Sequence, residues 1–172
     1  FFIFNSEAQT QLGQTLWGDA QHDRFGWSVA LGNSDGTLAV GAPYADINGA
    51  SSGLARIFLF DGTSWNQMGN DILGESAGDE FGRSIDLNDD GQIVVIGSDY
   101  HDNFTGQLRV YEWFQTAGNW VQMGPDIDGE NAGDWFGYSC SINSAGNIIA
   151  GGAVGNNDAG NDAGSARVYQ LS

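Results

Sequence analysis

The carboxylates with catalytic potential in this chain recur at a nearly constant spacing. An acid stands two residues before each of three Phe-Gly pairs, as Asp23, Asp79 and Asp134. Carboxylates can act as general acids or bases. A pair of carboxylates can act as acid and base together only where a pocket gives the two groups different pKa values. An acid that recurs once in every copy of a motif is more typical of a structural element, so we predict no catalytic residue and no enzymatic activity.

The other reactive side chains support the same interpretation. His22 and His101 are the only histidines and stand at different places in the repeat, which argues against a shared metal or general-base role. Cys140, the only cysteine, occupies the position of Val29 and Ile85 in the other copies, which indicates a small buried side chain. No nucleophile elbow, zinc-binding helix or phosphate-cradling loop is present in the sequence.

The motif belongs to a longer unit that occurs three times. The Phe-Gly pairs begin at Phe25, Phe81 and Phe136, and are therefore 56 and 55 residues apart. Each is followed by a turn, by an apolar run that ends in glycine, and by a run that contains arginine and an aromatic residue. Self-similarity at such a period is typical of repeat architectures, in which each unit buries a face on the next.

Each unit predicts four antiparallel strands. The first alternates bulky and small residues from Phe25 to Leu31, and an Asp-Gly type of turn joins it to an almost continuously apolar second strand. The third strand contains the repeated arginine, and the fourth contains a Trp-x-Gln-Met-Gly run in two of the copies. Four such strands per repeat indicate an all-β fold made of β-propeller blades, either as a partial propeller or as half of a six-bladed homodimer.

The repeats also predict the domain boundaries. Residues 1–10 fit no unit and are interpreted as a signal-peptide remnant or a disordered leader, with an ordinary edge strand as the alternative. Residues 11–172 form three blades over about 19–74, 75–129 and 130–172, with the third completed by a strand at 11–18. A signal peptide would place the protein outside the cell, either secreted or on the cell surface.

The arginines and the overall charge are informative. Three of the five arginines, Arg56, Arg109 and Arg167, share one repeat position. Their recurrence predicts an ion pair between each arginine and the repeated aspartate, which is Asp23, Asp79 or Asp134. The chain has 22 acids, five arginines and no lysine, for a formal net charge of −17. Such a charge disfavours nucleic acid and favours cations and basic partners. No apolar stretch is long enough to span a membrane, so we predict no membrane insertion.

At these residues the chain resembles the FG-GAP repeat, the blade of integrin α-subunit propellers and of many bacterial exported proteins. The name stands literally in Gly41-Ala42-Pro43, and the resemblance extends over about residues 11–172. It implies a ring that usually has seven blades. The chain is therefore either a fragment of a longer array or a homo-oligomer in which two copies exchange the Gln11–Gly18 strand.

The resemblance also implies a calcium loop between the first two strands of a blade. The second repeat matches that loop in part through Asp86, Asn88 and Asp90, whereas Val94 stands where the last aspartate is expected. Calcium requires six to eight oxygen ligands. A Ca²⁺ site at these residues and a plain Asp-Gly hairpin without metal are the two interpretations.

One position of the motif changes from copy to copy, as Trp27, Arg83 and Tyr138. By resemblance to integrins, these residues would form a partner-binding surface on the propeller face; the alternative is that they pack beneath loops. The expected function is a non-catalytic, exported recognition or adhesion module that binds protein or glycan. An accessory propeller domain of a larger secreted carbohydrate-active enzyme and a structural spacer are the alternatives.

Overall fold

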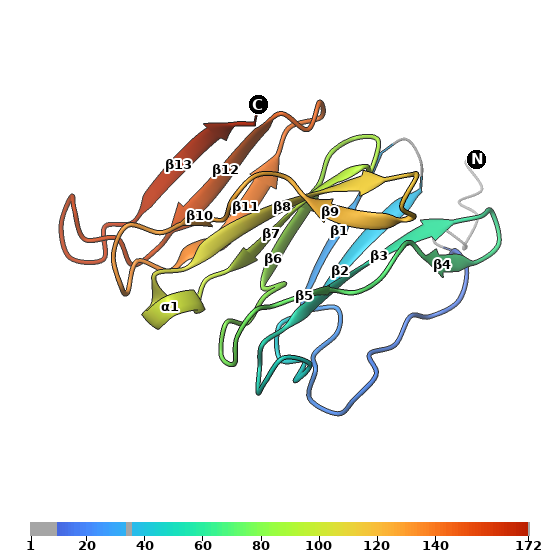
Figure 1. Ribbon diagram of the computed structural model, residues 1–172, viewed down its shortest axis with the longest axis horizontal. Coiled ribbons are helices and arrows are strands. Elements are labelled where there is room, and N and C mark those ends of the chain that lie inside the picture. The colour runs from blue at the N-terminus through green and yellow to red at the C-terminus, as the bar shows by residue number, and fades with distance from the viewer. Residues whose placement is uncertain (1–9, 34–35, 172) are drawn as a thin grey trace, which may run out of the picture.

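The computed structural model describes residues 10–33 and 36–171, which form three antiparallel sheets side by side (Figure 1). The first sheet comprises β1 (Ser28–Leu31), β2 (Thr37–Ala42), β3 (Leu54–Phe60), β4 (Trp65–Gln67) and β5 (Ile72–Leu73). The second comprises β6 (Ser84–Leu87), β7 (Ile93–Ser98), β8 (Gln107–Phe114), β9 (Asn119–Gln122) and β10 (Ile127–Asp128). The third comprises β11 (Phe136–Ile142), β12 (Ile148–Ala153) and β13 (Ser165–Gln170). The predicted leader lies, apart from residue 10, outside the described residues.

Each sheet is one blade, and its strands pair in chain order. The fourth strand of the first two blades is divided, because β4 and β5 both pair with β3, and β9 and β10 both pair with β8. The expected all-β fold with propeller-type blades is thus confirmed. The only helix among the described residues, α1 (His101–Phe104), is one irregular turn in which Asp102 and Asn103 have left-handed backbone angles. No helix in this part of the chain is long and apolar enough to cross a bilayer.

The third blade has three strands in the described part of the chain. The prediction that residues 11–18 complete it is wrong for a single chain, because this segment lies against blade one. There, Gln14 exchanges two hydrogen bonds with the backbone of Trp65, at 2.7 and 3.0 Å. No strand is assigned to residues 11–18, and among the described strands β13 pairs only with β12.

The Phe-Gly pairs form turns at which the chain enters a blade. Gly26, Gly82 and Gly137 have φ angles of 93°, 89° and 86°, a region that a side chain disfavours. The first strands of blades one and two consequently begin at Ser28 and Ser84. The predicted start at the phenylalanine is wrong for these two blades. In blade three, Phe136 belongs to β11, but the pairing register shifts immediately after it.

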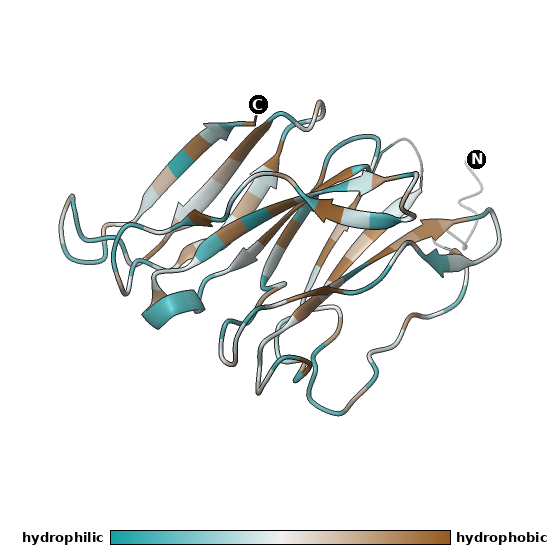
Figure 2. Cartoon of the chain, viewed as in Figure 1, coloured by the Kyte–Doolittle hydropathy of each residue, from teal (hydrophilic) through white to brown (hydrophobic). Residues whose placement is uncertain are grey.

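Apolar side chains pack between neighbouring blades. Figure 2 shows that hydrophobic residues, in brown, recur along the strands of all three sheets. The core between blades one and two includes Ile57, Phe81, Ile85, Val94 and Ile96, and the core between blades two and three includes Val95, Leu108, Val110, Phe136 and Ile149. The bulky side of each first strand faces the preceding blade. It is therefore buried in blade two but exposed in blade one, where Val29 and Leu31 are 63% and 64% exposed.

A serine hydroxyl joins each blade to the next. Ser28 Oγ donates a hydrogen bond to the carbonyl of Gly82, and Ser84 Oγ donates one to the carbonyl of Gly137, both at 2.7 Å. These carbonyls approach the second strand of the preceding blade so closely that a Cβ atom at Gly41 would lie 2.0 Å from the Gly82 oxygen. Glycine at this repeat position is therefore required by the approach of the next blade.

The repeated arginines pair with different acids from those predicted. The Nη1 atoms of Arg109 and Arg167 lie 3.6 Å from Glu75 and 3.7 Å from Glu130, respectively. Arg56 pairs with Asp71 at 2.7 Å and with Asp19. The hydrogen bonds to Asp71 and Asp19 hold the pKa of Arg56 above its ordinary value. The carboxylates of the motif instead accept hydrogen bonds from the backbone three residues earlier, in Asp23 from Ala20, in Asp79 from Ser76 and in Asp134 from Asn131. The predicted Arg–Asp pairing is wrong because these aspartates close their own loops.

Candidate recognition face

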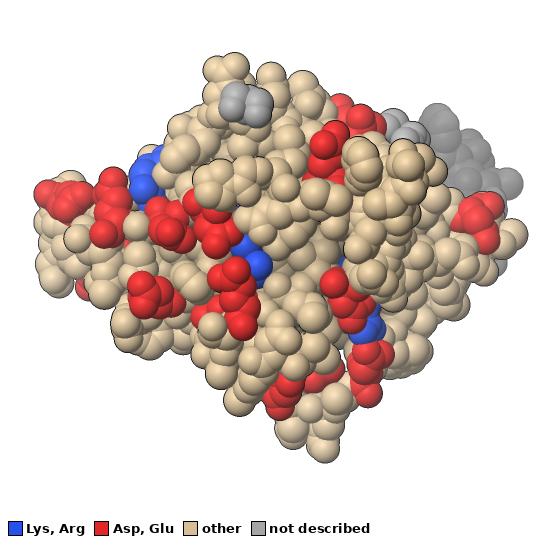
Figure 3. Space-filling model, viewed as in Figure 1, with Lys and Arg blue, Asp and Glu red and all other residues tan. Residues whose placement is uncertain are grey.

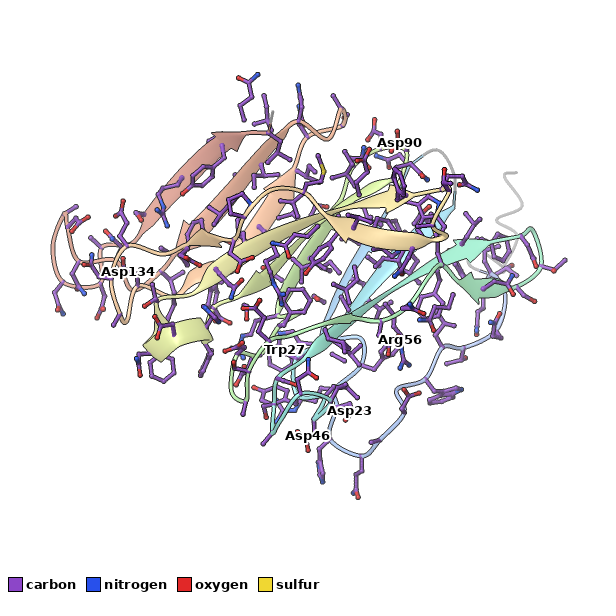
Figure 4. The ribbon with its side chains drawn as sticks, in the orientation of Figure 1. Asp23, Trp27, Asp46, Arg56, Asp90 and Asp134 are labelled. Atoms are coloured by element: carbon purple, nitrogen blue, oxygen red, sulfur yellow. The ribbon has the colours of Figure 1, made fainter. Side chains whose placement is uncertain are left out.

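The loops at one end of the blades bring the variable residues of the motif to the surface. Figure 4 shows Asp23, Trp27 and Asp46 at the lower ends of the strands of blade one, and Asp90 at the opposite end of the molecule. The residue between the aspartate and the phenylalanine is Arg24, Glu80 or Trp135, with φ angles of 54°, 54° and 55°. One backbone conformation thus displays three different side chains, which is the arrangement expected of a constant frame with variable contacts.

Aromatic and arginine side chains form a continuous row on this face, which we call the aromatic–arginine row (Arg24, Trp27, Tyr44, Arg83 and Tyr100). The Arg24 guanidinium carbon lies 4.4 Å from the Tyr44 ring centre and 5.4 Å from that of Trp27. The Arg83 guanidinium carbon lies 4.9 Å from Trp27 and 5.2 Å from Tyr100. Cation–π attraction of this kind holds a positive charge over aromatic faces, so the row alternates rings and cations across blades one and two.

Further rings extend the row toward blade three. Tyr100 packs edge-on against Phe104 at 5.0 Å between ring centres, and Phe104 packs against Trp135 at 6.5 Å. Trp27, Phe104 and Trp135 are 43%, 44% and 39% exposed. Large exposed rings that lie in contact with one another form a surface suited to a partner.

Acids behind the row fix the Arg83 side chain. Its Nη1 atom lies 2.5 Å from Glu80, its Nε atom lies 3.5 Å from Asp99, and it donates a hydrogen bond of 3.3 Å to the Tyr44 hydroxyl. The side chain of Asp99 is only 1% exposed. Burial raises the pKa of Asp99 to about 6, although the charge of Arg83 opposes this shift. Arg83 is thereby held in one orientation, with its guanidinium between two rings.

Two hollows at equivalent places in blades one and two flank the row. The first, of about 320 Å³, is lined by Gln21, His22, Arg24, Tyr44, Asp46, Ala50 and Ser51. The second, of about 350 Å³, is lined by Ser76, Ala77, Asp79, Tyr100, His101, Asp102 and Asn103. The two histidines, which do not correspond in the repeat, each line one hollow. His101 Nδ1 lies 3.3 Å from Asp79 Oδ1. Each hollow therefore combines a tyrosine, a histidine and at least one aspartate.

The structure brings together two of the three residues predicted to bind a partner. Trp27 and Arg83 are in contact, whereas Tyr138 lies on blade three and is 47% exposed. Sequence reasoning missed Tyr44 and Tyr100. Their signal was present, because each follows directly after the Gly-Ala-Pro or Gly-Ser-Asp triplet of its repeat.

The residues predicted for calcium are engaged in hydrogen bonds within the protein. Asp86 Oδ2 accepts bonds from the Ser141 hydroxyl and the Ile142 backbone of the next blade, at 3.0 and 2.9 Å. The Asn88 and Asp90 side chains both accept from the backbone N–H of residue 92, which closes the turn. Among the described residues, no group of three or more His, Cys, Asp or Glu side chains could hold a metal ion. As placed, this set of oxygens does not fit the six to eight ligands of calcium.

Cys140 lies at the core between blades two and three, where its Sγ atom is 3.7 Å from the Val95 carbonyl. Burial of the sulfur raises the pKa of the thiol to about 12, which leaves it protonated at neutral pH. The cysteine therefore packs as a small apolar residue, in agreement with its repeat position.

Comparison with known proteins supports the repeat and the fold. The FG-GAP repeat family model matches residues 18–58, and no curated protein matches the chain. Among solved structures, Sqt1 from Saccharomyces cerevisiae, a β-propeller protein, matches 94% of this chain and 36% of its own, with a TM-score of 0.56 and 13% identity. TolB from Acinetobacter baumannii matches 88% of this chain and 31% of its own, with a TM-score of 0.48 and 14% identity. The chain thus spans about a third of the length of these structures, and the likeness to Sqt1 concerns the fold alone.

Proposed function

We propose that this chain, which carries an FG-GAP repeat in an array of β-propeller blades, is a non-catalytic recognition or adhesion module. It would act outside the cell, secreted or on the cell surface, and bind protein or glycan. The binding surface would be the aromatic–arginine row with its two hollows. Propellers carry many unrelated activities, so this proposal depends on the side chains of that face rather than on the fold.

The observation that carries the proposal is the contact of Trp27 with Arg83 on an exposed face. Tryptophan, tyrosine and arginine are the residue types most enriched among those that dominate the energy of protein interfaces. Tryptophan and tyrosine offer a large contact area with only about two side-chain torsions, and arginine offers a planar set of hydrogen-bond donors. All five members of the row have partners that hold them in place, through ring contacts and through the ion pairs of Arg83. A side chain that is ordered before binding loses less conformational entropy on association.

The charge of the face indicates which ligands suit it. Figure 3 shows acidic groups distributed widely over one side of the molecule, with the few basic groups beside them. Asp46 and Asp102 line the two hollows, and the whole chain has a formal net charge of −17. A basic protein segment would gain from this field. The hydroxyl groups of a neutral glycan would instead donate hydrogen bonds to the same carboxylates.

A combined protein and glycan binding array tests the proposal. The wild type is compared with Trp27→Ala, with Tyr138→Ala and with Phe114→Ala, a matched control whose ring is 53% exposed on β8, away from the row. Loss of a central aromatic residue costs about 2 kcal/mol or more, so Trp27→Ala should weaken binding roughly thirtyfold. The control should bind as the wild type does. Unchanged binding by Trp27→Ala would refute the assignment of the site.

We also propose that the module works as a homo-oligomer. Within the described residues, the face of blade one and the outer edge of β13 have no partner strand or blade. A second copy could cover both, and the recognition face would then extend over the loops of two chains.

A further inference from the structure

We infer that blade three carries a socket for blade one of a second copy of this chain, joined head to tail. The socket comprises Ser139, Gly152, Gly164, Val168 and the outer edge of β13. This inference deepens the proposed homo-oligomer and thus rests on that part of the proposed function. It assigns the socket to specific residues of blade three, none of which belongs to the aromatic–arginine row.

The two interfaces between blades within the chain show what a filled socket requires. At Gly97, an added Cβ atom would lie 2.2 Å from the Gly137 carbonyl oxygen of the next blade and 2.2 Å from Ser84 Oγ. At Gly106, it would lie 2.0 Å from the Phe136 oxygen, and this pair forms an isolated parallel bridge. The interface between blades one and two has the same contacts, at Gly41 and Gly53. Both glycines are therefore needed because a Phe-Gly pair of the next blade lies against them.

Blade three has the same residues without the Phe-Gly pair. A Cβ atom at Gly152 would meet only Ser139, with Oγ at 2.5 Å, and one at Gly164 would have its nearest neighbours at 3.5 Å, in residues 153 and 154 of its own blade. In the described part of the chain, the Ser139 hydroxyl has no hydrogen-bond partner, whereas Ser28 and Ser84 each bind the glycine carbonyl of the next blade. The socket is thus formed, and among the described residues nothing fills it.

Blade one presents the complementary surface. Its Phe25-Gly26 pair lies beside an apolar groove of about 260 Å³, which is lined by Gln14, Leu16, Val29, Leu38, Val40 and Trp65. Val29 and Leu31 are more than 60% exposed there, while the equivalent Ile85 and Leu87 of blade two are less than 10% exposed under blade one. On the socket side, Val168 is 68% exposed, whereas the equivalent Val110 of blade two is 2% exposed. The exposed apolar face of blade one and the exposed apolar face of blade three could therefore cover each other.

The segment at residues 11–18 already has the geometry of a fourth strand from a preceding blade. Trp65 Nε1 donates a hydrogen bond to the Leu12 carbonyl at 3.0 Å, as Trp120 Nε1 donates to the Met68 carbonyl of the preceding blade at 2.8 Å. The Asp19–Arg56 pair likewise corresponds to the Glu75–Arg109 pair across the next interface. In a head-to-tail pair, this segment would lie along β13 of the partner copy and provide the fourth strand of its blade three.

A second copy is the occupant that these contacts favour, because the chain itself carries both halves of the interface. Such a contact is heterologous, so it closes into a ring when the rotation allows and otherwise continues as a longer assembly. It also continues, in the same register, an interface that already exists twice within the chain. The exposed side chains of Leu12 and Trp17, 63% and 78% accessible, would be covered by the same arrangement.

Sedimentation velocity over a range of protein concentrations tests the inference with the whole chain. The wild type should show species of at least twice the 18.3 kDa of one chain. Gly152→Ala should weaken association by at least about tenfold, because its methyl group would occupy the place of the incoming carbonyl. Val168→Asp should do the same by placing a charge in the apolar contact. Val121→Asp, at a residue 49% exposed on β9, is the matched control and should associate as the wild type does.

Circular dichroism of the variants at low concentration establishes that each chain still folds. Gly152→Ala should fold normally, because within the chain its methyl group displaces only the rotatable Ser139 hydroxyl. A monomeric wild type at every concentration would overturn the inference. So would an oligomer that Gly152→Ala and Val168→Asp both leave intact, because association would then use another surface. Ligand binding on the array is measured independently, so failure of the socket leaves the recognition site to its own test.

Discussion

The phenylalanine of the repeated motif should contribute very differently to stability in blades one and two, although the sequence around it is nearly the same. Phe81 is fully buried between blades one and two, and the Arg109 guanidinium carbon lies 4.1 Å from its ring centre. Phe25 is only partly buried, and Arg56 lies farther from its ring, at 5.9 Å. We therefore compare Phe81→Ala with Phe25→Ala.

The magnitude follows from burial. Truncation of a fully buried phenylalanine to alanine costs about 3–5 kcal/mol, through lost transfer free energy and the cavity that remains. Loss of the cation–π contact with Arg109 adds about 1 kcal/mol. For Phe25, whose ring is partly in water, we expect a loss of about 1–2 kcal/mol, since the transfer term is smaller and no closed cavity forms. The difference between the two variants should therefore be about 3 kcal/mol.

Urea unfolding followed by tryptophan fluorescence measures both losses, at concentrations where sedimentation shows single chains. Total stability of a domain this size is about 5–15 kcal/mol, so Phe81→Ala could prevent folding altogether. Phe81→Leu then replaces it, with an expected loss of about 1–2 kcal/mol, since most of the volume is kept. Equal losses of unfolding free energy for Phe81→Ala and Phe25→Ala would refute the conclusion that each blade packs its first strand on the preceding blade and that this face of blade one is uncovered.

Three further results are expected. The free energy of unfolding of Asp99→Asn relative to that of the wild type should rise by up to about 3 kcal/mol as the pH increases from 4 to 7. The reason is that the raised pKa of Asp99 makes its ionisation unfavourable in the folded state, so the wild type loses stability over that range whereas the asparagine variant does not. A stability difference that does not change with pH in urea titrations would contradict this. Asp86→Ala should lower stability by about 1–3 kcal/mol in the same assay, since the Ser141 hydroxyl and the Ile142 N–H lose their acceptor, and a neutral result would show that these bonds do not join the blades. Addition of calcium or of a chelator should leave the thermal midpoint unchanged, whereas a rise with calcium would show that the Asp90 hairpin rearranges to bind it.

The periodicity of the sequence was sufficient to predict the blades, because each blade repeats one pattern of turns and apolar runs. It did not predict where the first strand starts. Gly26 and Gly82 adopt left-handed backbone angles, which break the strand even though the alternation of side chains continues through them. It also could not predict that the bulky face of blade one is exposed, since burial depends on a neighbouring blade rather than on local pattern.

The ion pairs and the recognition face show a second limit. The sequence offers several acids, among them Glu75 and Asp79, that could pair with Arg109. Only the loop geometry decides that Glu75 is its partner, because Asp79 accepts a hydrogen bond from the backbone N–H of Ser76. Trp27 and Arg83 were predicted from variation at one repeat position. Tyr44 was missed although it directly follows the Gly-Ala-Pro triplet, because its contact with Trp27 joins two loops and cannot be read from one motif.

Hydrogen–deuterium exchange with a ligand taken from the binding array shows which loops of this chain bind the ligand. We expect protection on binding in the segments that carry the row and its hollows, which are residues 20–27, 44–52, 76–83 and 98–105. Protection confined to the hairpin at residues 86–93 or to the outer strands β4 and β9, with the loops of the row unchanged, would contradict it.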